Sequence, residues 1–478
     1  MTASGRAAIR LPRPAERSWW MEEALAQPEL AGPPCPPLSG DLGADVVILG
    51  GGYTGMWSAF FLTERAPGID VVLLERDVCG GGPSGRNGGF CNAFWEEAAT
   101  LVRAVGEEGA RRTCEVAERS LDEIEAWCKG EGVDAWFTRA GHLGVATSPA
   151  QDGAWRETVG AAARLGSDWF TELSADEVAE RCRSPRFRAG VLAPRAATVH
   201  PARLARGLRR VLLERGVRIF EGSPVRRFRP GPAPTAETPG GSVRARRAIL
   251  GLNAWMSRWR RFHRSVLPRG SYIVMTEPAP ERLAEIGWTG GEGIYDFRTA
   301  LHYLRTTPDG RIAFGAASSR AGLGTGLGPR LEYDEASVAR LVRDLHRMFP
   351  ALRDVALECA WGGPIDVTGL HLPFFGTLPG GAAHYGLGFT GGGVAPCHLA
   401  GRILSGLALD VADEHTTLPL VGIQPRRFPP EPLLSLGALA VHEAILRKDE
   451  AEDEGRRPGV LVDLLARMPR RLGYEIGP

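Results

Sequence analysis

The sequence predicts an α/β fold in which a nucleotide-binding domain is interleaved with an α+β domain built on a mixed or antiparallel sheet. Three observations predict it. A strand, a glycine turn and a helix follow one another over residues 44–76. The same succession returns near the other end of the chain, over residues 385–407. The chain of 478 residues is also too long for one ordinary core.

The first stretch has the features of a dinucleotide site. Residues 45–49 form an apolar run, as expected of a parallel strand covered on both faces. Glycines in GxGxxG spacing follow it: Gly50, Gly52 and Gly55. They permit a tight turn, close approach of a pyrophosphate and close packing of the helix that starts at Tyr53. Glu75, at the end of the next strand, can accept ribose hydroxyls, so the stretch predicts a Rossmann-type domain.

Two further glycine-rich stretches offer bare backbone to a flat ligand. The loop 79–90 directly follows the second strand. Its candidate ligand-binding residues are Ser84, Arg86, Asn87, Gly88 and Gly89. The later candidate residues are Gly391, Gly392, Gly393 and Val394, and a helix follows them with Pro396 in its first turn. The N-terminus of that helix would attract partial negative charge on a ligand.

Composition and missing motifs exclude several classes of protein. A net charge of +1 gives no reason to expect nucleic acid as a partner. The eight cysteines are scattered, and no signal peptide or transmembrane run is present, so we expect a reduced, cytoplasmic protein. The sequence has no GxxxxGK, HExxH or GxSxG, and Lys129 and Lys448 are its only lysines. A P-loop phosphotransferase, a metal site, a serine hydrolase and a lysine-imine enzyme therefore have no support.

The order of these elements suggests discontinuous domains. Residues 1–43 form an N-terminal arm that packs Trp19 and Trp20 on the body. We expect 44–95, 183–262 and 359–410 to form the nucleotide-binding domain, 96–182 and 263–358 a substrate domain, and 411–478 a tail with a helix near 434–447. We also expect loops at 230–241 and 321–328, and a solvated charged end at 448–457.

A set of motifs, in order from residue 40 to 410, resembles the D-amino-acid-oxidase superfamily of FAD-dependent enzymes, and within it the amine oxidoreductases. The motifs are GGGYTG (50–55), SGRNGG (84–89), HPARL (200–204), LNAW (252–255), YLRTTPDGRI (303–312), WGGPIDVTGLHLPFFG (361–376) and GFTGGGVAPCHLAGRIL (388–404).

The resemblance implies FAD as cofactor. Its pyrophosphate would lie on Tyr53 and Thr54, its ribose on Glu75 beside Arg76, and its adenine near Val225. The loop 84–89 would lie along the flavin, and the helix after Gly393 would face the N1 and O2 edge of the ring. Relatives with a covalent flavin carry a cysteine where this chain has Trp361 and Gly362, so we expect non-covalent FAD.

The same resemblance implies dehydrogenation of a carbon–nitrogen bond, with hydride passing to flavin N5 and the imine then hydrolysed. The acceptor is O2, giving H2O2, or another oxidant. Glycine and D-amino-acid oxidases hold the substrate carboxylate with an arginine where this chain has Gly362, Gly363 and Pro364, which favours an amine with a more distant polar end. An NAD-dependent dehydrogenase and a non-catalytic flavin-binding scaffold are the alternatives.

Four side chains are candidates on the substrate side. In a strand over 301–305, His302 and Tyr303 face opposite ways, and one of them should line the site. His302 either assists deprotonation of the amine or is a structural histidine. Asp366 either receives an ammonium group or caps a turn. Arg86 either holds an anion or packs its own loop.

Overall fold

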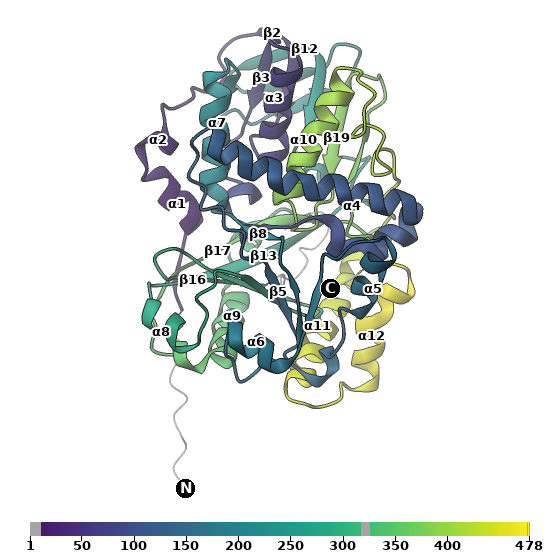
Figure 1. Ribbon diagram of the computed structural model, residues 1–478. Helices are drawn as coiled ribbons and strands as arrows, with labels where there is room; N and C mark the ends of the chain where they lie inside the picture. Colours follow the sequence, from purple (N-terminus) through teal and green to yellow (C-terminus); the bar gives the residue numbers. More distant parts are fainter. Residues whose placement is uncertain (1–10, 317–325, 476, 478) are drawn as a thin grey trace.

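Two large sheets, one above the other in Figure 1, carry the fold of the computed structural model, which describes residues 11–316, 326–475 and 477. The upper sheet has the order β10-β11-β12-β2-β3-β9, and β19 also pairs with β12 and with β18. Its strands are β2 (Leu42–Leu49), β3 (Val71–Leu74), β9 (Arg218–Phe220), β10 (Arg227–Arg229), β11 (Thr235–Thr238), β12 (Gly241–Leu250), β18 (Phe374–Thr377) and β19 (Ala383–Leu387). The β19-β12-β2-β3-β9 part is parallel, as predicted for the nucleotide-binding domain.

The lower sheet is mixed, has nine strands and follows the order β1-β17-β13-β16-β15-β14-β5-β7-β6. Its strands are β1 (Arg13–Pro14), β5 (His142–Val145), β6 (Thr171–Leu173), β7 (Gly190–Ala193), β13 (Leu267–Thr276), β14 (Gly293–Asp296), β15 (His302–Thr306), β16 (Ile312–Ala316) and β17 (Leu357–Val367). Two short strands, β4 (Phe90–Cys91) and β8 (Ala197–Thr198), pair with each other and belong to neither large sheet. Strand β7 and all but the first two residues of β17 lie in segments that we assigned to the nucleotide-binding domain, and both strands pair in this lower sheet.

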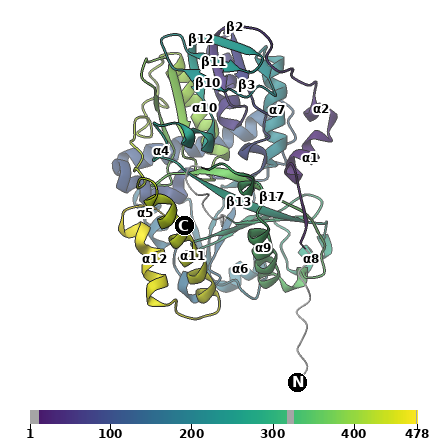
Figure 2. The ribbon, with the colours of Figure 1, turned by 180° about the vertical axis from the view of Figure 1, so that it is seen from behind.

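Helices cover the outer faces of the two sheets (Figures 1 and 2). With the upper sheet lie α3 (Tyr53–Arg65), α7 (Pro201–Glu214) and α10 (Val394–Ala408), and the long α4 (Ala98–Gly130) passes across them. Below the lower sheet lie α6 (Ala175–Arg181), α8 (Pro280–Glu285) and α9 (Glu335–Met348). The arm forms α1 (Trp19–Leu25) and α2 (Pro28–Ala31), and α5 (Arg156–Arg164), α11 (Leu433–Asp453) and α12 (Val460–Arg471) group on one side.

Two apolar cores hold these layers. One lies between the upper sheet and helices α3, α4, α7 and α10, and the other between the lower sheet and α9. Close packing of α10 on α3 requires a glycine, because a Cβ at Gly401 would lie 2.6 Å from the Cβ of Trp57. The arm packs Trp19 and Trp20 into the body as predicted, and Trp20 is fully buried.

The structure corrects two sequence expectations and leaves a third outside its range. The expected loop 230–241 contains β11, which forms a hairpin with β12. The charged run 448–457 is not a solvated end, because α11 continues through it to Asp453 and buries Asp449 and Asp453. Most of the expected glycine loop 321–328 lies outside the described residues.

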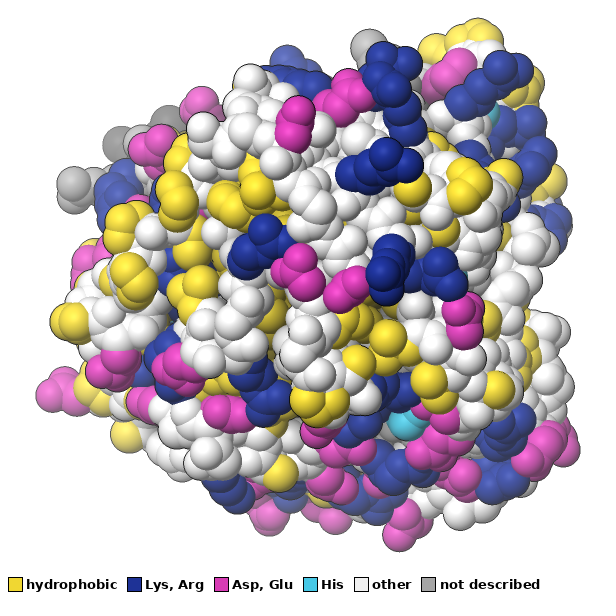
Figure 3. All heavy atoms as spheres, turned by 90° about the horizontal axis from the view of Figure 1, so that it is seen from above, with side chains coloured by type: hydrophobic (Ala, Val, Ile, Leu, Met, Phe, Trp, Pro, Cys, Tyr) yellow, Lys and Arg dark blue, Asp and Glu magenta, His cyan; other side chains and the backbone are white. Residues whose placement is uncertain are grey.

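Basic and acidic side chains lie next to one another over the face seen in Figure 3, in keeping with the near balance of 57 Lys and Arg against 56 Asp and Glu. Within the described parts of the chain, no helix is both long enough and apolar enough to cross a membrane.

Candidate active site

A cavity of about 2060 Å³ lies between the two sheets. This volume is about twice the upper end of the usual range for a ligand pocket. Its lining includes sixteen of the predicted site residues: Gly50, Gly52, Tyr53, Thr54, Glu75, Arg76, Ser84, Arg86, Asn87, Gly88, Val225, Tyr303, Asp366, Gly391, Gly392 and Gly393. Four predicted residues are not in the lining: Gly55, Gly89, Val394 and His302. The cavity can therefore hold a large ligand along the glycine turns with space left on the side of the lower sheet.

The first glycine turn leaves no room for side chains. Gly50 has a φ of +103°, and a Cβ there would lie 2.4 Å from the carbonyl oxygen of Gly251. A Cβ at Gly55 would lie 2.0 Å from the oxygen of Gly50, so the helix can pack this close only with glycine at that position. Gly52 is the N-cap of α3 and makes no side-chain cap, and Gly52, Tyr53 and Thr54 at this helix start all line the cavity. The turn thus has the geometry of an anion-binding helix start.

Glu75 supports this turn from the end of β3. Its carboxylate accepts the N–H of Gly51 at 2.7 Å and the N–H of Asp77 at 2.9 Å. Burial raises the pKa of Glu75 above its ordinary value. Beside it, the Arg76 guanidinium lies 4.3 Å from the ring centroid of Trp255, which also lines the cavity. The predicted ribose end of the site is therefore bordered by one carboxylate and one cation stacked on an indole.

Hydrogen bonds to other segments of the chain hold the loop 84–89 in place. The hydroxyl of Ser84 accepts the N–H of Tyr53 at 2.8 Å, which ties the loop to the start of α3. Arg86 donates to three carbonyl oxygens, those of Gly81, Gly362 and Glu16, at 2.9–3.0 Å. The Arg86 guanidinium thus joins backbone carbonyls of three separate segments. These contacts explain the position of Arg86 by packing of its loop.

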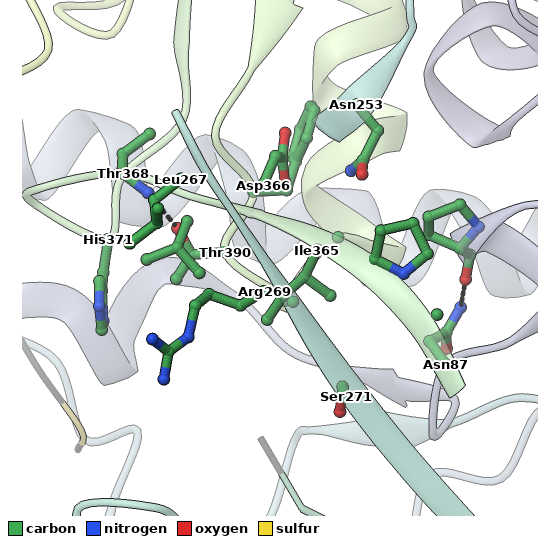
Figure 4. A pocket seen from close by; sticks show the side chains of 18 of the residues that line it. Asn87, Asn253, Leu267, Arg269, Ser271, Ile365, Asp366, Thr368, His371 and Thr390 are labelled. Atoms are coloured by element: carbon green, nitrogen blue, oxygen red, sulfur yellow. Dashed lines mark hydrogen bonds between the residues drawn. The ribbon is translucent and has the colours of Figure 1, made fainter. Parts of the chain in front are cut away.

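A buried carboxylate, Asp366, lies at the cavity close to the second glycine turn. Asp366, at the end of β17, accepts the N–H of Gly388 on Oδ2 at 2.6 Å, and its Oδ1 is buried without a partner among the described residues. Burial raises the pKa of Asp366 to about 6. Figure 4 shows Asp366 with Asn253 and Asn87 around the same space, opposite Arg269 and Ser271 on β13. The adjacent turn has a φ of +91° at Gly391 and leads into α10, capped by Gly393.

Tyr303 forms part of the cavity wall on the lower sheet. Its hydroxyl lies 2.7 Å from the hydroxyl of Ser271, on β13. Its ring covers Gly88, where a Cβ would approach to 2.8 Å, and Gly315, where a Cβ would approach to 2.3 Å. Burial raises the pKa of Tyr303 to about 12, so the phenol keeps its proton near neutrality. Tyr303 therefore presents a neutral hydroxyl opposite the loop 84–89.

His302 lies on the opposite face of β15 and does not reach this cavity. Its Nδ1 is 2.7 Å from Asp296 and its Nε2 is 3.3 Å from Asp344 on α9. Burial acts to lower the pKa of His302, but the two carboxylates outweigh it and raise this pKa to about 9. The expected catalytic histidine is thus a structural one here, because alternation along the strand turns it away from Tyr303.

Sequence reasoning missed several residues of the lining: Asn92, Glu96, Glu97, Asn253, Arg269, Ser271 and Tyr295. Arg269 and Ser271 are two residues apart on β13, so their side chains lie on the same face of the strand. Once one of them is known to face the cavity, this alternation predicts the other. Glu96 and Glu97 follow the glycine loop 79–90 after five residues, and this nearness in the sequence was the available signal for the two glutamates.

Comparison with known proteins decides the family. A model of the FAD-dependent oxidoreductase family, DAO, matches residues 45–407. The chain belongs to this family. It is 30% identical over 391 residues to the OrdL protein of Rhizobium meliloti, covering 80% of this chain and 87% of that one. It is 30% identical over 378 residues to gamma-glutamylputrescine oxidoreductase of Escherichia coli, covering 78% and 85%.

The fold of this FAD-dependent oxidoreductase is also found in solved structures. Glycine oxidase from Geobacillus kaustophilus superposes with a TM-score of 0.66 at 18% identity, covering 81% of this chain and all of that one. The residues present fit FAD. A Cβ would clash at Gly50 and Gly55 of the first glycine turn, and two helices, α3 and α10, start beside the cavity.

Proposed function

We propose that this FAD-dependent oxidoreductase dehydrogenates a carbon–nitrogen bond of an amine or amino-acid derivative. FAD, when bound, supplies the acceptor for the hydride at flavin N5, and water hydrolyses the released imine. One observation carries the proposal: a single cavity joins both glycine turns to the Tyr303 face of the lower sheet. The name of the Escherichia coli relative, an oxidoreductase of an amine derivative, supports the substrate class.

The chain's own residues would bind and orient the amine. The paired hydroxyls of Tyr303 and Ser271 can donate to and accept from a neutral amine at the cavity wall. The free Oδ1 of Asp366 can take the proton that an ammonium must lose before oxidation, since a base with a pKa near the working pH is the most effective. The start of α10 stabilises negative charge at the far edge of the site.

We further propose that FAD is held without a covalent bond. Cys359 is buried in the cluster that contains Trp20 and Trp361, away from the lining. Cys397 does line the cavity, but burial raises the pKa of its thiol to about 12, so it stays protonated. Acid precipitation should therefore release the yellow chromophore into the supernatant.

The electron acceptor is O2 or another oxidant. Neither lysine lies in the lining: Lys129 pairs with Glu125 on α4, and Lys448 pairs with Glu452 on α11. Reoxidation by air after anaerobic reduction separates an oxidase from a dehydrogenase.

Product analysis tests the proposed function. One equivalent of amine mixed anaerobically with the holoenzyme should yield one carbonyl product and one ammonia or smaller amine for each flavin reduced. Amine left unchanged while the flavin stays oxidised, across primary and secondary amines and amino acids, would contradict the proposal and favour the scaffold alternative.

A further inference from the structure

Exposed hydrophobic side chains gather on the helix pair α11 and α12. Seven large hydrophobic side chains of the described residues are well exposed, and six of them lie on this pair: Leu433, Leu436, Val460, Leu461, Leu464 and Leu472. We call these six the hairpin patch. Leu433 is 65% exposed, Leu436 62% and Val460 88%. Single exposed leucines are ordinary, but a group of this size on one helix pair is typical of a contact surface.

Helix α12 is apolar on two faces, although it has one helix to pack against. Its inner face packs on α11, where Ala466 joins Ala444 and Ile445 in one apolar cluster. Its outer face carries three exposed leucines at helical spacing: Leu461, Leu464 and Leu472. A surface helix of a globular protein normally has one apolar stripe, which faces the core. The outer stripe of α12, at the edge of the molecule in Figures 1 and 2, therefore has no packing role in the described fold.

The hairpin patch adjoins the rim of the cavity. The turn 454–459 joins α11 to α12, and Ala466 packs beside Ala444 and Ile445, so the two helices run antiparallel. The start of α11 and the end of α12 thus lie at the same end of the hairpin. Leu433 and Leu472 are at least half exposed and also line the cavity there. A body that covers the hairpin patch would lie against the cavity mouth.

Arginines without acidic partners lie at this end of the hairpin. Arg426 and Arg427 precede α11, and Arg471 ends α12. All three are exposed, and among the described residues none of them forms an ion pair. The guanidinium of Arg426 lies 5.3 Å from the ring centroid of Tyr474, just beyond α12. Glu431 is the one acidic residue of the sequence from 415 to 442, so the positive charge here is not balanced locally.

A second arginine-rich segment lies beside the first. Residues 258–264 contain four arginines and no acidic residue. The N–H of Phe428 donates to the carbonyl oxygen of Arg264, and Nε of Arg264 donates to the carbonyl oxygen of Phe428, both at 2.7 Å. The ring of Phe428 stacks on Tyr474 with centroids 5.4 Å apart. These contacts bring both arginine-rich segments to the end of α12 that carries Leu472.

Leucines next to unbalanced arginines favour an anionic lipid surface as the occupant. Leucine side chains enter the boundary between headgroups and acyl chains, while arginines are attracted to the negative surface charge. A second copy of the chain fits less well, because a twofold contact would bring the same unpaired arginines of both protomers together. The charge of this region therefore selects between the two occupants that its apolar side chains would allow.

We propose that the α11–α12 hairpin docks this protein on an anionic lipid bilayer, with the rim of the cavity at the membrane surface. This inference goes beyond the proposed function and does not depend on it, because the docking residues lie outside the reacting side of the cavity.

Cosedimentation with vesicles tests the inference on the full chain loaded with FAD. One set of vesicles contains phosphatidylcholine alone, and the other contains equal parts of phosphatidylcholine and phosphatidylglycerol. The protein should bind the anionic vesicles at low salt roughly tenfold or more tightly than the neutral ones. This binding should weaken as salt is added, because salt screens exposed charges.

Variants of exposed residues outside the cavity lining locate the surface. Leu436→Ser and Leu461→Ser should each weaken binding by about tenfold, because each removes apolar area from the lipid contact. Arg426→Gln combined with Arg427→Gln should weaken binding to anionic vesicles by about twentyfold, at roughly fivefold for each arginine. The ratio of flavin to protein should stay that of the wild type in every variant, which shows that the fold is kept.

Two controls match these changes elsewhere on the surface. Val411→Ser removes the seventh exposed hydrophobic side chain, and Arg244→Gln with Arg246→Gln removes two exposed arginines of β12. Both controls should bind vesicles like the wild type. No binding to anionic vesicles at low salt, or binding that the hairpin variants leave unchanged, would overturn the inference. A dimer in light scattering that Leu436→Ser converts to monomers would also overturn it, because the hairpin patch would then belong to a second copy.

Discussion

At the scale of single residues, the site depends on positions where no larger side chain fits. Gly52 caps α3 at the cavity, and a Cβ there would already lie 3.0 Å from the hydroxyl of Ser84. A branched side chain would also project toward the place where a pyrophosphate meets the helix start. Backbone approach to the ligand, rather than any side-chain contact, is therefore the property that this residue provides.

Gly52→Val should yield folded but colourless protein, because the added methyl groups occupy the space of the pyrophosphate. The ratio of flavin to protein absorbance after purification measures this loss. Gly43→Val is the matched control, since Gly43 lies in the same strand and turn unit with nothing within 4 Å of an added Cβ. Full retention of FAD by Gly52→Val would refute this placement of the cofactor.

Tyr303→Phe should lower the rate constant of flavin reduction by about tenfold, the effect of losing one hydrogen bond of about 1.4 kcal/mol to the substrate. Stopped-flow absorbance under anaerobic conditions measures it. Tyr333→Phe, on a half-buried tyrosine outside the lining, should leave the rate unchanged. An unaltered rate in Tyr303→Phe would show that this hydroxyl does not touch the amine.

At the scale of elements, a buried charge network fastens α11 to the lower sheet. Arg298, in the turn between β14 and β15, lies 3.4 Å from Asp453 on α11 and 3.5 Å from Asp344 on α9. Asp449 on α11 accepts the N–H of Ala300 at 2.8 Å. His302 joins the same network through Asp344 and Asp296. The tail helix is thereby held against the sheet whose other face lines the cavity.

This network predicts a loss of stability in alkaline solution. The folded-state pKa of His302 is raised to about 9 from an ordinary 6.5, so its contribution is fully present below pH 6.5 and is lost as pH rises through about 9. The loss should be on the order of 3 kcal/mol in the free energy of unfolding. Denaturant unfolding at several pH values measures it.

His302→Gln should be less stable at neutral pH and should lose most of this decline between pH 6.5 and 9. His263→Gln, on an exposed histidine, should decline like the wild type. Equal pH dependence in His302→Gln and the wild type would contradict the assignment of the effect to this histidine.

At the scale of the whole molecule, the features that could be predicted from the sequence are those that a local sequence pattern determines. The turn at Gly50, Gly52 and Gly55 and the parallel strands around it were predictable, because spacing and apolar runs specify them directly. The face on which His302 lies, away from the cavity and toward α9, was not predictable, since either face of β15 satisfied the alternation. The burial of Asp449 and Asp453 was also missed, because their partner Arg298 lies in a distant part of the chain.

The tail adds to the site beyond the segment that the family model covers. Residues of α11 and α12, including Val441, Ile445 and Met468, line the cavity, although the matched segment ends at residue 407. The cavity is thus completed by elements from both ends of the sequence, which no local motif could indicate. Substrate size should depend on these helices as well as on the sheet.

The most direct test of the account is the visible spectrum of the purified protein during anaerobic addition of primary and secondary amines in turn. We predict an oxidised flavin band that bleaches completely with about one equivalent. A flavin band that survives every amine would contradict amine oxidation while leaving the FAD site intact, and the absence of any flavin band in protein purified with FAD would contradict the cofactor assignment itself.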